Sequence, residues 1–342
     1  MAHPPPLAAP PPALLDAAGA PRLGAFAGDL PAVELAALAP PGVAGRLSRV
    51  LRGKRWLYAM AASDGVLAAL AIVEAGWFAG GFAWALDRRS GAVLWEGSAA
   101  GLPGRHATVA AGARGAAAAR LRARGLALGI AREGGAWRLS AASADGAFAL
   151  EGALDAAGAP APFALVVPVP GGGVRATQKA AALRASGTVR VRGRTLALAG
   201  GSGGVDLTAG LLARETSWRW AFGTGRAGGA PLGLNLCAGF GVPDGDPGEN
   251  AGFGGAAPWR LPPVAFDVGG AGAPWRIASA SRAVDLVFRP QGAHREARNL
   301  GVLRTRFAQV AGTFEGTIPG RAGEPVELSG LPGVVEDHWA VW

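Results

Sequence analysis

The sequence predicts an all-β fold in which antiparallel strands form a sandwich or barrel. Apolar and polar residues alternate with a period of two over many short segments, which is typical of strands with one buried face. Turn signals separate these segments about every 8–12 residues. The chain also contains 56 Gly and 26 Pro among its 342 residues. Such a content suits many turns and disfavours a largely helical protein.

The predicted strands begin at residue 54. Trp56, Tyr58 and Met60 share one face of a strand over 54–60, and the turn Ser63-Asp64-Gly65 leads into an apolar run at 66–73. The same alternation, broken by Gly-, Asp- and Arg-containing turns, continues along the chain. It predicts strands at 82–86, 92–95, 126–130, 137–139, 148–150, 163–169, 188–199 (a hairpin), 217–222, 232–239, 264–268, 275–280, 283–288, 302–310 and 312–318.

Two segments have the alanine content of a short helix, Ala110–Ala119 and Ala176–Ala185. The segment 168–173, rich in Pro and Gly, interrupts strand pairing, and we expect the seam between two similar halves there. The predicted organisation is an extended, Pro- and Ala-rich lead-in over 1–45, an N-terminal β half over 46–172 and a C-terminal β half over 173–342.

Composition excludes some classes of partner. Half of the residues are hydrophobic, so the chain can bury a substantial core. The net charge is +9, but the cations are almost all Arg and are scattered. In the densest group (Arg114, Arg120, Arg122 and Arg124) the last three share one face of a strand, as on an ordinary solvated surface. We therefore expect no nucleic-acid partner.

The cysteine and histidine content bears on compartment and metal binding. Cys237 is the one cysteine, so no intrachain disulfide can form, which fits a reducing compartment. The start of the chain makes a poor signal peptide, and no apolar run is long enough for a transmembrane helix. We expect a cytoplasmic protein. The four histidines show no metal-ligand spacing, and we predict neither a metal nor a cofactor.

Two glycine motifs are interpreted as turns. Gly223–Gly228 matches G-x-G-x-x-G, but Gly229-Ala230-Pro231 follows and cannot begin the helix that a dinucleotide site needs. Gly200–Gly204 matches G-x-S-x-G, but no helix follows the serine, as a nucleophile elbow requires. We expect a hairpin loop and a flexible turn.

Tryptophan and polar side chains gather in the second half of the chain. Trp218 and Trp220 share one face of a strand, as one wall of an apolar pocket or as ordinary barrel core. Asn235, Glu249 and Asn250 follow as polar anchors of such a pocket or as loop caps. Near the C-terminus, 336–338 (Glu-Asp-His) supplies acid–base groups or is a polar strand with exposed alternate positions.

Taken in order, these residues resemble the bacterial DUF2804 family, a domain of unknown function, over about residues 50–342. The residues that carry the resemblance are Lys54-Arg55-Trp56, Thr177-Gln178-Lys179, Asp206…Gly210, Thr216-x-Trp218-x-Trp220-Ala221, Asn235-Leu236, Glu249-Asn250, Pro274-Trp275, Leu286-Val287-Phe288-Arg289-Pro290, Gln309-x-x-Gly312-x-Phe314-x-Gly316 and Gly333…Glu336…Trp339.

That family is more distantly similar to two-barrel proteins that include carotenoid hydratases of the hydroxyneurosporene synthase type. The resemblance implies two lipocalin-like β-barrel or sandwich halves packed together, with a lipid- or isoprenoid-like ligand. It transfers no catalytic residue, because none of those enzymes' catalytic residues matches a position of this chain.

Three functions follow as hypotheses. The first is binding of a small hydrophobic molecule in a β-barrel pocket. The second is a hydratase, cyclase or isomerase that acts on such a ligand through a buried, protonated carboxyl group. The third is a structural module with filled barrels. The sequence does not determine the oligomeric state.

The residues assigned to the site fall into two groups. The candidate acids are Glu249 first, then Asp206 and Glu336. The candidate ligand-binding residues are Trp218, Trp220 and Trp275 as apolar walls, Asn235 and Asn250 as polar anchors, and Gln178 and Lys179 from the family motif.

Overall fold

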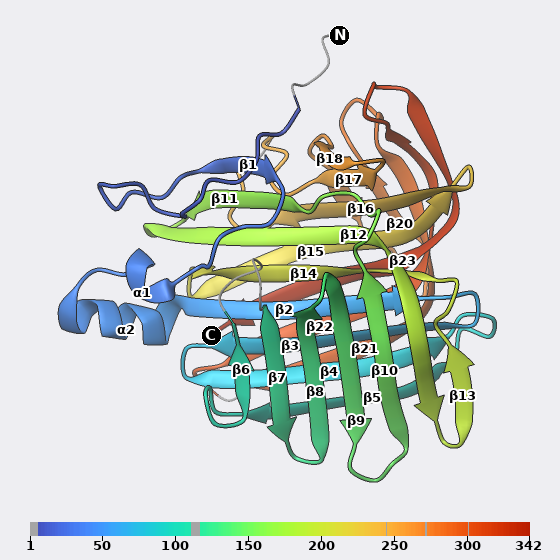
Figure 1. Cartoon of the computed structure of the whole chain (residues 1–342), viewed down its shortest axis with the longest axis horizontal. Coiled ribbons are helices and arrows are strands. Elements are labelled where there is room, and N and C mark those ends of the chain that lie inside the picture. Colours follow the sequence, from blue (N-terminus) through green and yellow to red (C-terminus); the bar gives the residue numbers. More distant parts are fainter. Residues whose placement is uncertain (1–5, 111–116, 244, 271, 300) are drawn as a thin grey trace.

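The computed structural model describes residues 6–110, 117–243, 245–270, 272–299 and 301–342. It is nearly all β, with two antiparallel sheets and a short helical segment near the N-terminus (Figure 1). One sheet curls into a nearly closed barrel and the other into a half-barrel. The predicted all-β fold of two halves is therefore confirmed.

The described residues form elements with the following bounds. They are β1 (Gly24–Ala27), α1 (Leu35–Leu38), α2 (Gly42–Arg52), β2 (Gly53–Ala62), β3 (Val66–Ala75), β4 (Phe78–Asp87), β5 (Val93–Gly101), β6 (Ala107–Val109), β7 (Ala118–Ala123), β8 (Leu126–Glu133), β9 (Ala136–Ser143), β10 (Phe148–Asp155), β11 (Phe163–Val169), β12 (Gly173–Val191), β13 (Arg194–Ala197), β14 (Ser202–Leu211), β15 (Glu215–Ala227), β16 (Ala230–Gly239), β17 (Ala251–Gly254), β18 (Ala257–Arg260), β19 (Ala265–Asp267), β20 (Trp275–Ala278), β21 (Asp285–Asn299), β22 (Arg304–Pro319) and β23 (Pro325–Val341).

The larger sheet contains the first part of the chain. Its strands are hydrogen-bonded in the order β5-β4-β3-β2-β14-β12-β10-β9-β8-β7-β6, and β11 and β13 also pair with the long strand β12. The sheet folds over itself, so that β6–β10 lie across β2–β5 (Figure 1). A cluster of buried Ala, Leu, Ile and Val side chains fills the space between the two layers. The interior of this barrel is thus a packed core.

The smaller sheet is antiparallel in the order β18-β17-β16-β15-β23-β22-β21-β20-β19. Register matters for the site. Trp220 of β15 lies opposite Glu336 of β23, and Glu336 in turn lies opposite Gln309 of β22. Because residues in register point to the same face, these side chains form one row across three strands.

Strands β2, β3 and β4 are buried on both faces, which explains the apolar run at 66–73. One face points into the barrel, and the other packs against β15, β16, β22 and β23 of the smaller sheet. A strand covered on both sides has few solvent-facing positions and loses the polar alternation. The two sheets approach closely: a Cβ atom at Gly204 would lie 2.4 Å from the ring of Phe222.

The segment Ala176–Ala185, expected as a helix from its alanine content, is part of strand β12, so that prediction is wrong. Helix propensity is a weak preference, and here the backbone pairs with β11 and β14 along most of its length. The pairing shifts between Ala180 and Leu183, where Ala182 has a φ of 60° and its N–H donates to Thr224 Oγ1. The other expected helix, Ala110–Ala119, lies largely outside the described residues, and its last two residues open β7.

The segment 168–173 forms the connection between β11 and β12 within the larger sheet. The chain changes sheet later, between the end of β14 at Leu211 and the start of β15 at Glu215. Pro and Gly mark a turn in either arrangement, and the pairing of β12 with β14 and β10 decides which sheet it joins. On the outer face, Arg120 and Arg122 are exposed, and Arg114 lies outside the described residues.

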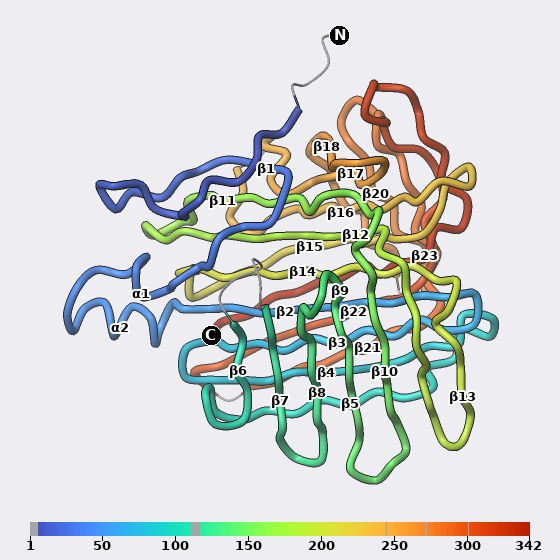
Figure 2. The backbone as a smooth tube through the Cα atoms, in the orientation of Figure 1, coloured from blue at the N-terminus to red at the C-terminus, as the bar shows by residue number. Residues whose placement is uncertain are grey.

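The N-terminal segment is tied to the larger sheet. β1 pairs with β11, and the trace in Figure 2 runs alongside that strand before it turns into α1 and α2. Leu14, Leu30 and Val33 are buried against Ala164 and Val166 of β11. The described part of this segment, residues 6–45, therefore includes β1, α1 and the start of α2, and its buried apolar residues pack on β11 and β12.

Replacing Leu57 by Ala should destabilise the protein by about 2–5 kcal/mol, because Leu57 is fully buried in the barrel core and its loss leaves a cavity. Val43→Ala is the matched control, since Val43 is 80% exposed and should change stability by less than about 0.5 kcal/mol. Urea unfolding followed by tryptophan fluorescence measures both. Equal stability of the two variants would contradict the described core.

Candidate functional site

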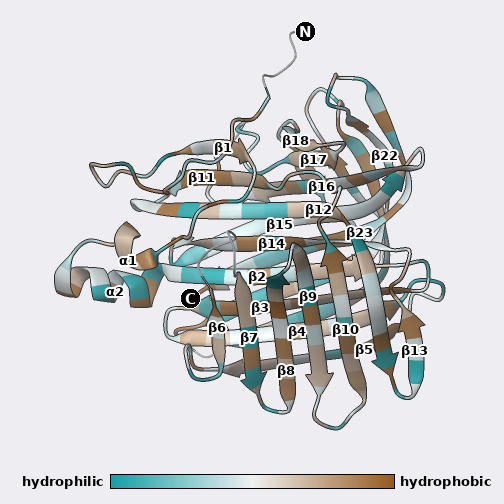
Figure 3. Ribbon diagram, viewed as in Figure 1, coloured by the Kyte–Doolittle hydropathy of each residue, from teal (hydrophilic) through white to brown (hydrophobic). Residues whose placement is uncertain are grey.

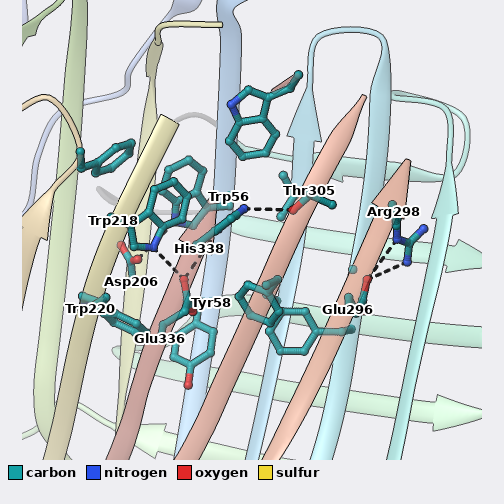
Figure 4. A pocket seen from close by; sticks show the side chains of 18 of the residues that line it. Trp56, Tyr58, Asp206, Trp218, Trp220, Glu296, Arg298, Thr305, Glu336 and His338 are labelled. Carbon is teal, nitrogen blue, oxygen red and sulfur yellow. Dashed lines mark hydrogen bonds and ion pairs between the residues drawn. The ribbon is translucent and has the colours of Figure 1, made fainter. Parts of the chain in front are cut away.

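A cavity of about 150 Å³ lies between the two sheets, outside the barrel core (Figure 4). The larger sheet contributes β2, β3, β4, β12 and β14, and the smaller sheet contributes β15, β16, β21, β22 and β23. The principal lining side chains are Trp56, Tyr58, Phe78, Phe82, Lys179, Asp206, Trp218, Trp220, Cys237, Phe240, Glu249, Glu296, Arg298, Thr305, Phe307, Glu336, His338 and Trp342. The sequence predicted a pocket inside a barrel, whereas the cavity lies between the two sheets.

Aromatic rings make most of the cavity wall, and they come from both sheets. Trp56 of β2 stacks on Trp218 of β15 with ring centroids 5.8 Å apart. Tyr58 meets Trp220 edge to face at 5.3 Å. Phe240, in the turn after β16, packs on Trp218 at 4.7 Å. The first two pairs join one sheet to the other, so this part of the wall exists only when the two sheets are docked. The contact between Phe240 and Trp218 lies on the side of the smaller sheet.

Glu336 presents a buried carboxyl group to this aromatic space. Trp218 Nε1 donates to Glu336 Oε1 at 2.8 Å, and Gln309 Nε2 donates to Oε2 at 3.1 Å. Burial away from water raises the pKa of Glu336 to about 7, although these two hydrogen bonds favour the ionised form. Near neutral pH a large fraction of Glu336 therefore carries its proton.

The orientation of the Gln309 side chain is set by Trp84 of the larger sheet. Trp84 Nε1, on β4 of the larger sheet, donates to Gln309 Oε1 at 2.9 Å. An indole N–H can only donate, so the amide oxygen must face Trp84 and the amide nitrogen must face Glu336. Trp84 and Gln309 are both fully buried. Trp84 therefore orients Gln309 across the two sheets, and Gln309 holds Glu336 through a hydrogen bond within the smaller sheet.

His338 lies two residues further along the same face of β23. Its Nε2 is 3.3 Å from Thr305 Oγ1 and its Nδ1 is 3.9 Å from Glu336 Oε1, and the ring packs against Trp218 (Figure 4). Burial lowers the pKa of His338 to about 3, so the imidazole is neutral at physiological pH. A neutral imidazole beside a protonated carboxyl provides one proton acceptor and one proton donor in the same cavity.

The other carboxylates of the cavity are paired with cations. Lys179 Nζ lies 2.7 Å from Asp206 Oδ1 and 3.2 Å from Glu249 Oε1, and Arg175 Nη1 lies 3.5 Å from Glu249 Oε2. Burial alone would raise the pKa of Glu249, but Lys179 and Arg175 hold it below its ordinary value. Burial alone would lower the pKa of Lys179, but Asp206 and Glu249 outweigh it and raise that pKa. Hydrophilic segments are visible along β12 in Figure 3.

A second ionic cluster connects the sheets at the edge of the cavity. His294 Nδ1 is 2.8 Å from Glu96 Oε2 of β5, and its Nε2 is 3.1 Å from Glu296 Oε1. Burial opposes ionisation of both groups, but contacts with His294 and Arg298 lower the pKa of Glu296 to about 2. Contacts with Glu296 and Glu96 raise the pKa of His294. Arg298 also donates to Ser98 Oγ of β5 at 3.1 Å. Glu296 is thus an ionised carboxylate that is paired with His294 and Arg298, and it is not a proton donor.

The structure brings together six of the residues assigned from sequence. Trp218, Trp220, Lys179, Asp206, Glu249 and Glu336 all line the cavity. Among them Glu249, assigned first as the acid, is the carboxylate that cations keep ionised. Glu336, assigned last, is the carboxyl group that burial keeps protonated. Sequence cannot rank them, because the partners Lys179 and Arg175 come from a distant strand.

The other four assigned residues lie behind the wall or away from it. Asn235 accepts from Trp220 Nε1 at 2.7 Å and donates to the backbone carbonyl of Glu249. Asn250 Oδ1 accepts from the Cys237 backbone N–H, so it acts as a loop cap. Gln178 holds the N-terminal segment by accepting from the Leu30 N–H. Trp275 belongs to the separate core of the smaller sheet.

Five residues of the site were not predicted from the sequence, namely Trp56, Tyr58, Trp84, Gln309 and Phe240. The period-two alternation placed Trp56 with Tyr58 on one face, but nothing in that pattern shows which sheet the face will meet. Among the described residues, no group of three His, Cys, Asp or Glu side chains is arranged to hold a metal ion. No helix in the described ranges is long and apolar enough to span a membrane.

Comparison with known proteins gives a family and a fold. The chain matches the family described as domain of unknown function DUF2804 over residues 8–342. No curated protein matches. A crystal structure described as a putative AttH from Nitrosomonas europaea superposes with a TM-score of 0.53 at 12% identity, covering 83% of this chain and 92% of that one. Kievitone hydratase from Nectria haematococca gives a TM-score of 0.52 at 14% identity, covering 91% of this chain and 93% of that one.

The protonation of Glu336 should be visible in the pH dependence of stability. An unfolded Glu has a pKa of about 4.3, so between there and about 7 the folded protein binds more protons than the unfolded chain. The contribution of Glu336 to the free energy of unfolding therefore falls as pH rises through that window. The free energy of unfolding of Glu336→Gln, relative to that of wild type, should therefore increase by about 3 kcal/mol between pH 4 and pH 8.

The comparison of variant with wild type at each pH isolates Glu336 from His338. The low pKa of His338 acts in the opposite direction, because the unfolded chain binds its proton first and stability from that group is lost as pH falls below about 6.5. Glu327→Gln, an exposed substitution on the same strand, is the control. A difference between Glu336→Gln and wild type that is constant with pH would contradict the raised pKa.

Proposed function

Because the chain belongs to the DUF2804 family, whose function is unknown, we propose its function from the cavity between its sheets. It binds a small hydrophobic, lipid- or isoprenoid-like molecule with a carbon–carbon double bond, and it catalyses hydration or dehydration of that bond. Cyclisation or isomerisation of the same ligand would use the same first step.

One observation carries this proposal, namely the state of Glu336. Of the four carboxyl groups that line the cavity, Asp206, Glu249 and Glu296 are paired with cations. Glu336 has no cation partner among the described residues, because His338 beside it is neutral. A carboxylic acid with a pKa of about 7 in an apolar cavity is poised for general acid catalysis at neutral pH.

Residues of the cavity wall supply the proton donor, the proton acceptor and the aromatic rings that hydration of a double bond requires. Glu336 gives its proton to one carbon of the double bond, and the other carbon becomes a carbocation. The faces of Trp218, Trp56 and Tyr58 stabilise that cation. Water adds to the cation while His338 accepts one of its protons, and return of that proton to the Glu336 carboxylate completes the cycle. In cyclisation or isomerisation, a second double bond or loss of a neighbouring proton replaces the water.

The fold comparison is consistent with this reaction class without deciding it. One of the two solved structures similar to this chain is described as a hydratase, and at 14% identity the likeness concerns the fold alone. Binding without turnover is the second candidate, and it is favoured by the aromatic walls that both sheets contribute. The cavity argues against a purely structural module with filled interiors.

We also infer a cytoplasmic location. Burial raises the pKa of the Cys237 thiol well above its ordinary value, so this single cysteine is kept as an unreactive thiol of the cavity wall. Such a residue suits a reducing compartment. Fractionation of the native cells and immunodetection of the protein check the location.

Ligand identification comes first and mutagenesis second. Native mass spectrometry followed by organic extraction should recover an apolar molecule in stoichiometric amount, which then serves as the substrate. Glu336→Gln should reduce kcat by about 10²- to 10⁴-fold, because it removes the acid. The Kd should stay within about threefold, since the shape of the wall is unchanged. Glu327→Gln is the matched control.

If Glu336→Gln keeps full turnover, Glu336 is not the acid. If it keeps affinity and no variant or condition yields a product, the protein is a carrier.

The pH profile of kcat/KM gives an independent test. Glu336 must be protonated and His338 must be neutral in the free protein. The rate should therefore be flat between about pH 3 and about pH 7 wherever the protein stays folded, and it should decline above about 7. Steady-state rates in buffers of constant ionic strength measure this. A rate that increases through pH 7 would assign Glu336 the role of a base.

A further inference from the structure

The ionic cluster at one side of the cavity has more hydrogen-bond donors than it uses. Arg175, Thr177 and Lys179 alternate along one face of β12, and the Arg175 and Lys179 side chains are 0% and 3% exposed. Lys179 has three N–H donors and directs two of them at Asp206 and Glu249. None of the nitrogen atoms of Arg175 makes a hydrogen bond within the described part of the chain.

This shortage of acceptors is unusual for a buried guanidinium. Arg175 Nη1 is at ion-pair distance from Glu249 Oε2, yet neither atom has hydrogen-bond geometry with any described partner. An unsatisfied buried donor costs about 1–3 kcal/mol, and more when it is charged. Buried polar groups in folded proteins are therefore almost always paired with protein, water or ligand atoms. Glu249 Oε2 lies near Nη1 alone, so Nε and Nη2 of Arg175 still lack an acceptor.

The charges of the cluster define the kind of acceptor. Arg175 and Lys179 carry two positive charges, and Asp206 and Glu249 carry two negative charges, so the cluster is already neutral. A third anion would leave a net buried charge, which is unfavourable in a low-dielectric site. A neutral oxygen with two lone pairs, such as a carbonyl oxygen, would satisfy the donors and leave the charge balanced.

Phe240 separates Arg175 from the cavity. Its ring covers the guanidinium, with Arg175 Cζ 3.9 Å from the ring centroid, and it also lines the cavity. Phe240 has a φ of 57°, between Gly239 at 86° and Gly241 at 71°. A non-glycine residue in this region is held at an energetic cost, and the two flanking glycines let the turn adopt other conformations. Movement of the Phe240 ring would open Arg175 to the space that Lys179 already faces.

We propose that Arg175 and Lys179 form a recognition subsite for a carbonyl oxygen of the ligand, with Phe240 as its movable cover. Lys179 Nζ lies 5.6 Å from the ring centroid of Trp220, which is the register neighbour of Glu336. The carbonyl end of the ligand would thus sit at one side of the cavity and the double bond at the other. This inference rests on the proposed ligand cavity, but it does not depend on acid catalysis.

The test compares three probes of one shape on the full-length protein. They are 4-phenylbut-3-en-2-one, which has a carbonyl group, 1-phenylbut-1-ene, which lacks it, and cinnamate, which carries a carboxylate. Quenching of tryptophan fluorescence measures their affinities. The ketone should bind about 10-fold more tightly than the hydrocarbon, as a hydrogen bond to a charged donor allows. The infrared carbonyl stretch of the bound ketone should lie below its frequency in hexane.

Two variants identify the donors. Arg175→Lys keeps the charge opposite Glu249 but removes the planar fork, and it should bring the affinity of the ketone close to that of the hydrocarbon. Phe240→Leu shortens the cover and should increase the preference for the ketone over the hydrocarbon. Thermal unfolding checks that each variant is folded, and the infrared measurement on wild type is independent of both variants.

Each outcome has a definite meaning. Equal affinities for ketone and hydrocarbon, or an unshifted carbonyl stretch, would overturn the subsite and leave the cavity in place. Tighter binding of cinnamate than of the ketone would show that the site takes an anion and would overturn the assignment to a neutral oxygen. If none of the probes binds, the proposed ligand cavity fails together with the subsite. If the ketone preference holds while Glu336→Gln retains turnover, only the proposed acid catalysis fails.

Discussion

The structure depends on one constraint, namely that strands β2, β3 and β4 are covered on both faces. One face closes the barrel of the larger sheet, and the other supports the smaller sheet. The cavity lies where aromatic rings on this second face meet those of β15, β22 and β23. A site of this kind is a property of the contact between the halves, and neither sheet contains it alone. Such interfaces are a common place for ligand sites in proteins.

The contact between the two sheets sets both the protonation and the orientation of Glu336. Its ionisation is governed by water exclusion, and its orientation is governed by Gln309, which takes its own orientation from Trp84 in the other sheet. The charged residues nearby have a different role. Lys179 and Arg175 keep Glu249 ionised, and Lys179 also forms an ion pair with Asp206, so these carboxylates are held in place while Glu336 remains protonated. Environments that push similar groups apart in pKa are typical of acid–base sites.

Much of the fold was predictable from local patterns. The period-two alternation located Trp218 with Trp220 and Trp56 with Tyr58, since side-chain direction in a strand follows from sequence spacing alone. The strand nature of 176–185 was not predictable, because pairing with β11, β14 and β10 overrides alanine's preference for helix. The change of sheet after Leu211 was not predictable either. Pro and Gly favour a turn both between strands of one sheet and between two sheets, so their presence does not show where the chain changes sheet.

The site was predictable only in part, for a related reason. Alternation identifies which residues share a face, but not which other face they will meet. Glu249 and Glu336 look alike in sequence, and they differ through Arg175, Lys179, Gln309 and Trp218, none of which is adjacent to its carboxyl partner along the chain. Asn235 and Asn250 were polar residues of the expected type, yet their hydrogen bonds go to the indole of Trp220 and to backbone groups behind the wall.

The hydrogen bond between Trp84 and Gln309 has a consequence for the timing of proton release. It spans the two sheets, so any separation of the sheets breaks it and admits water to Glu336 at the same moment. A hydrated carboxyl group returns toward the acidity of an ordinary glutamate and loses its proton to solvent. In the proposed reaction, Glu336 therefore keeps its proton only while water is excluded from it. Entry of water during ligand exchange would release that proton, and Glu336 would have to bind a proton again before the next turnover.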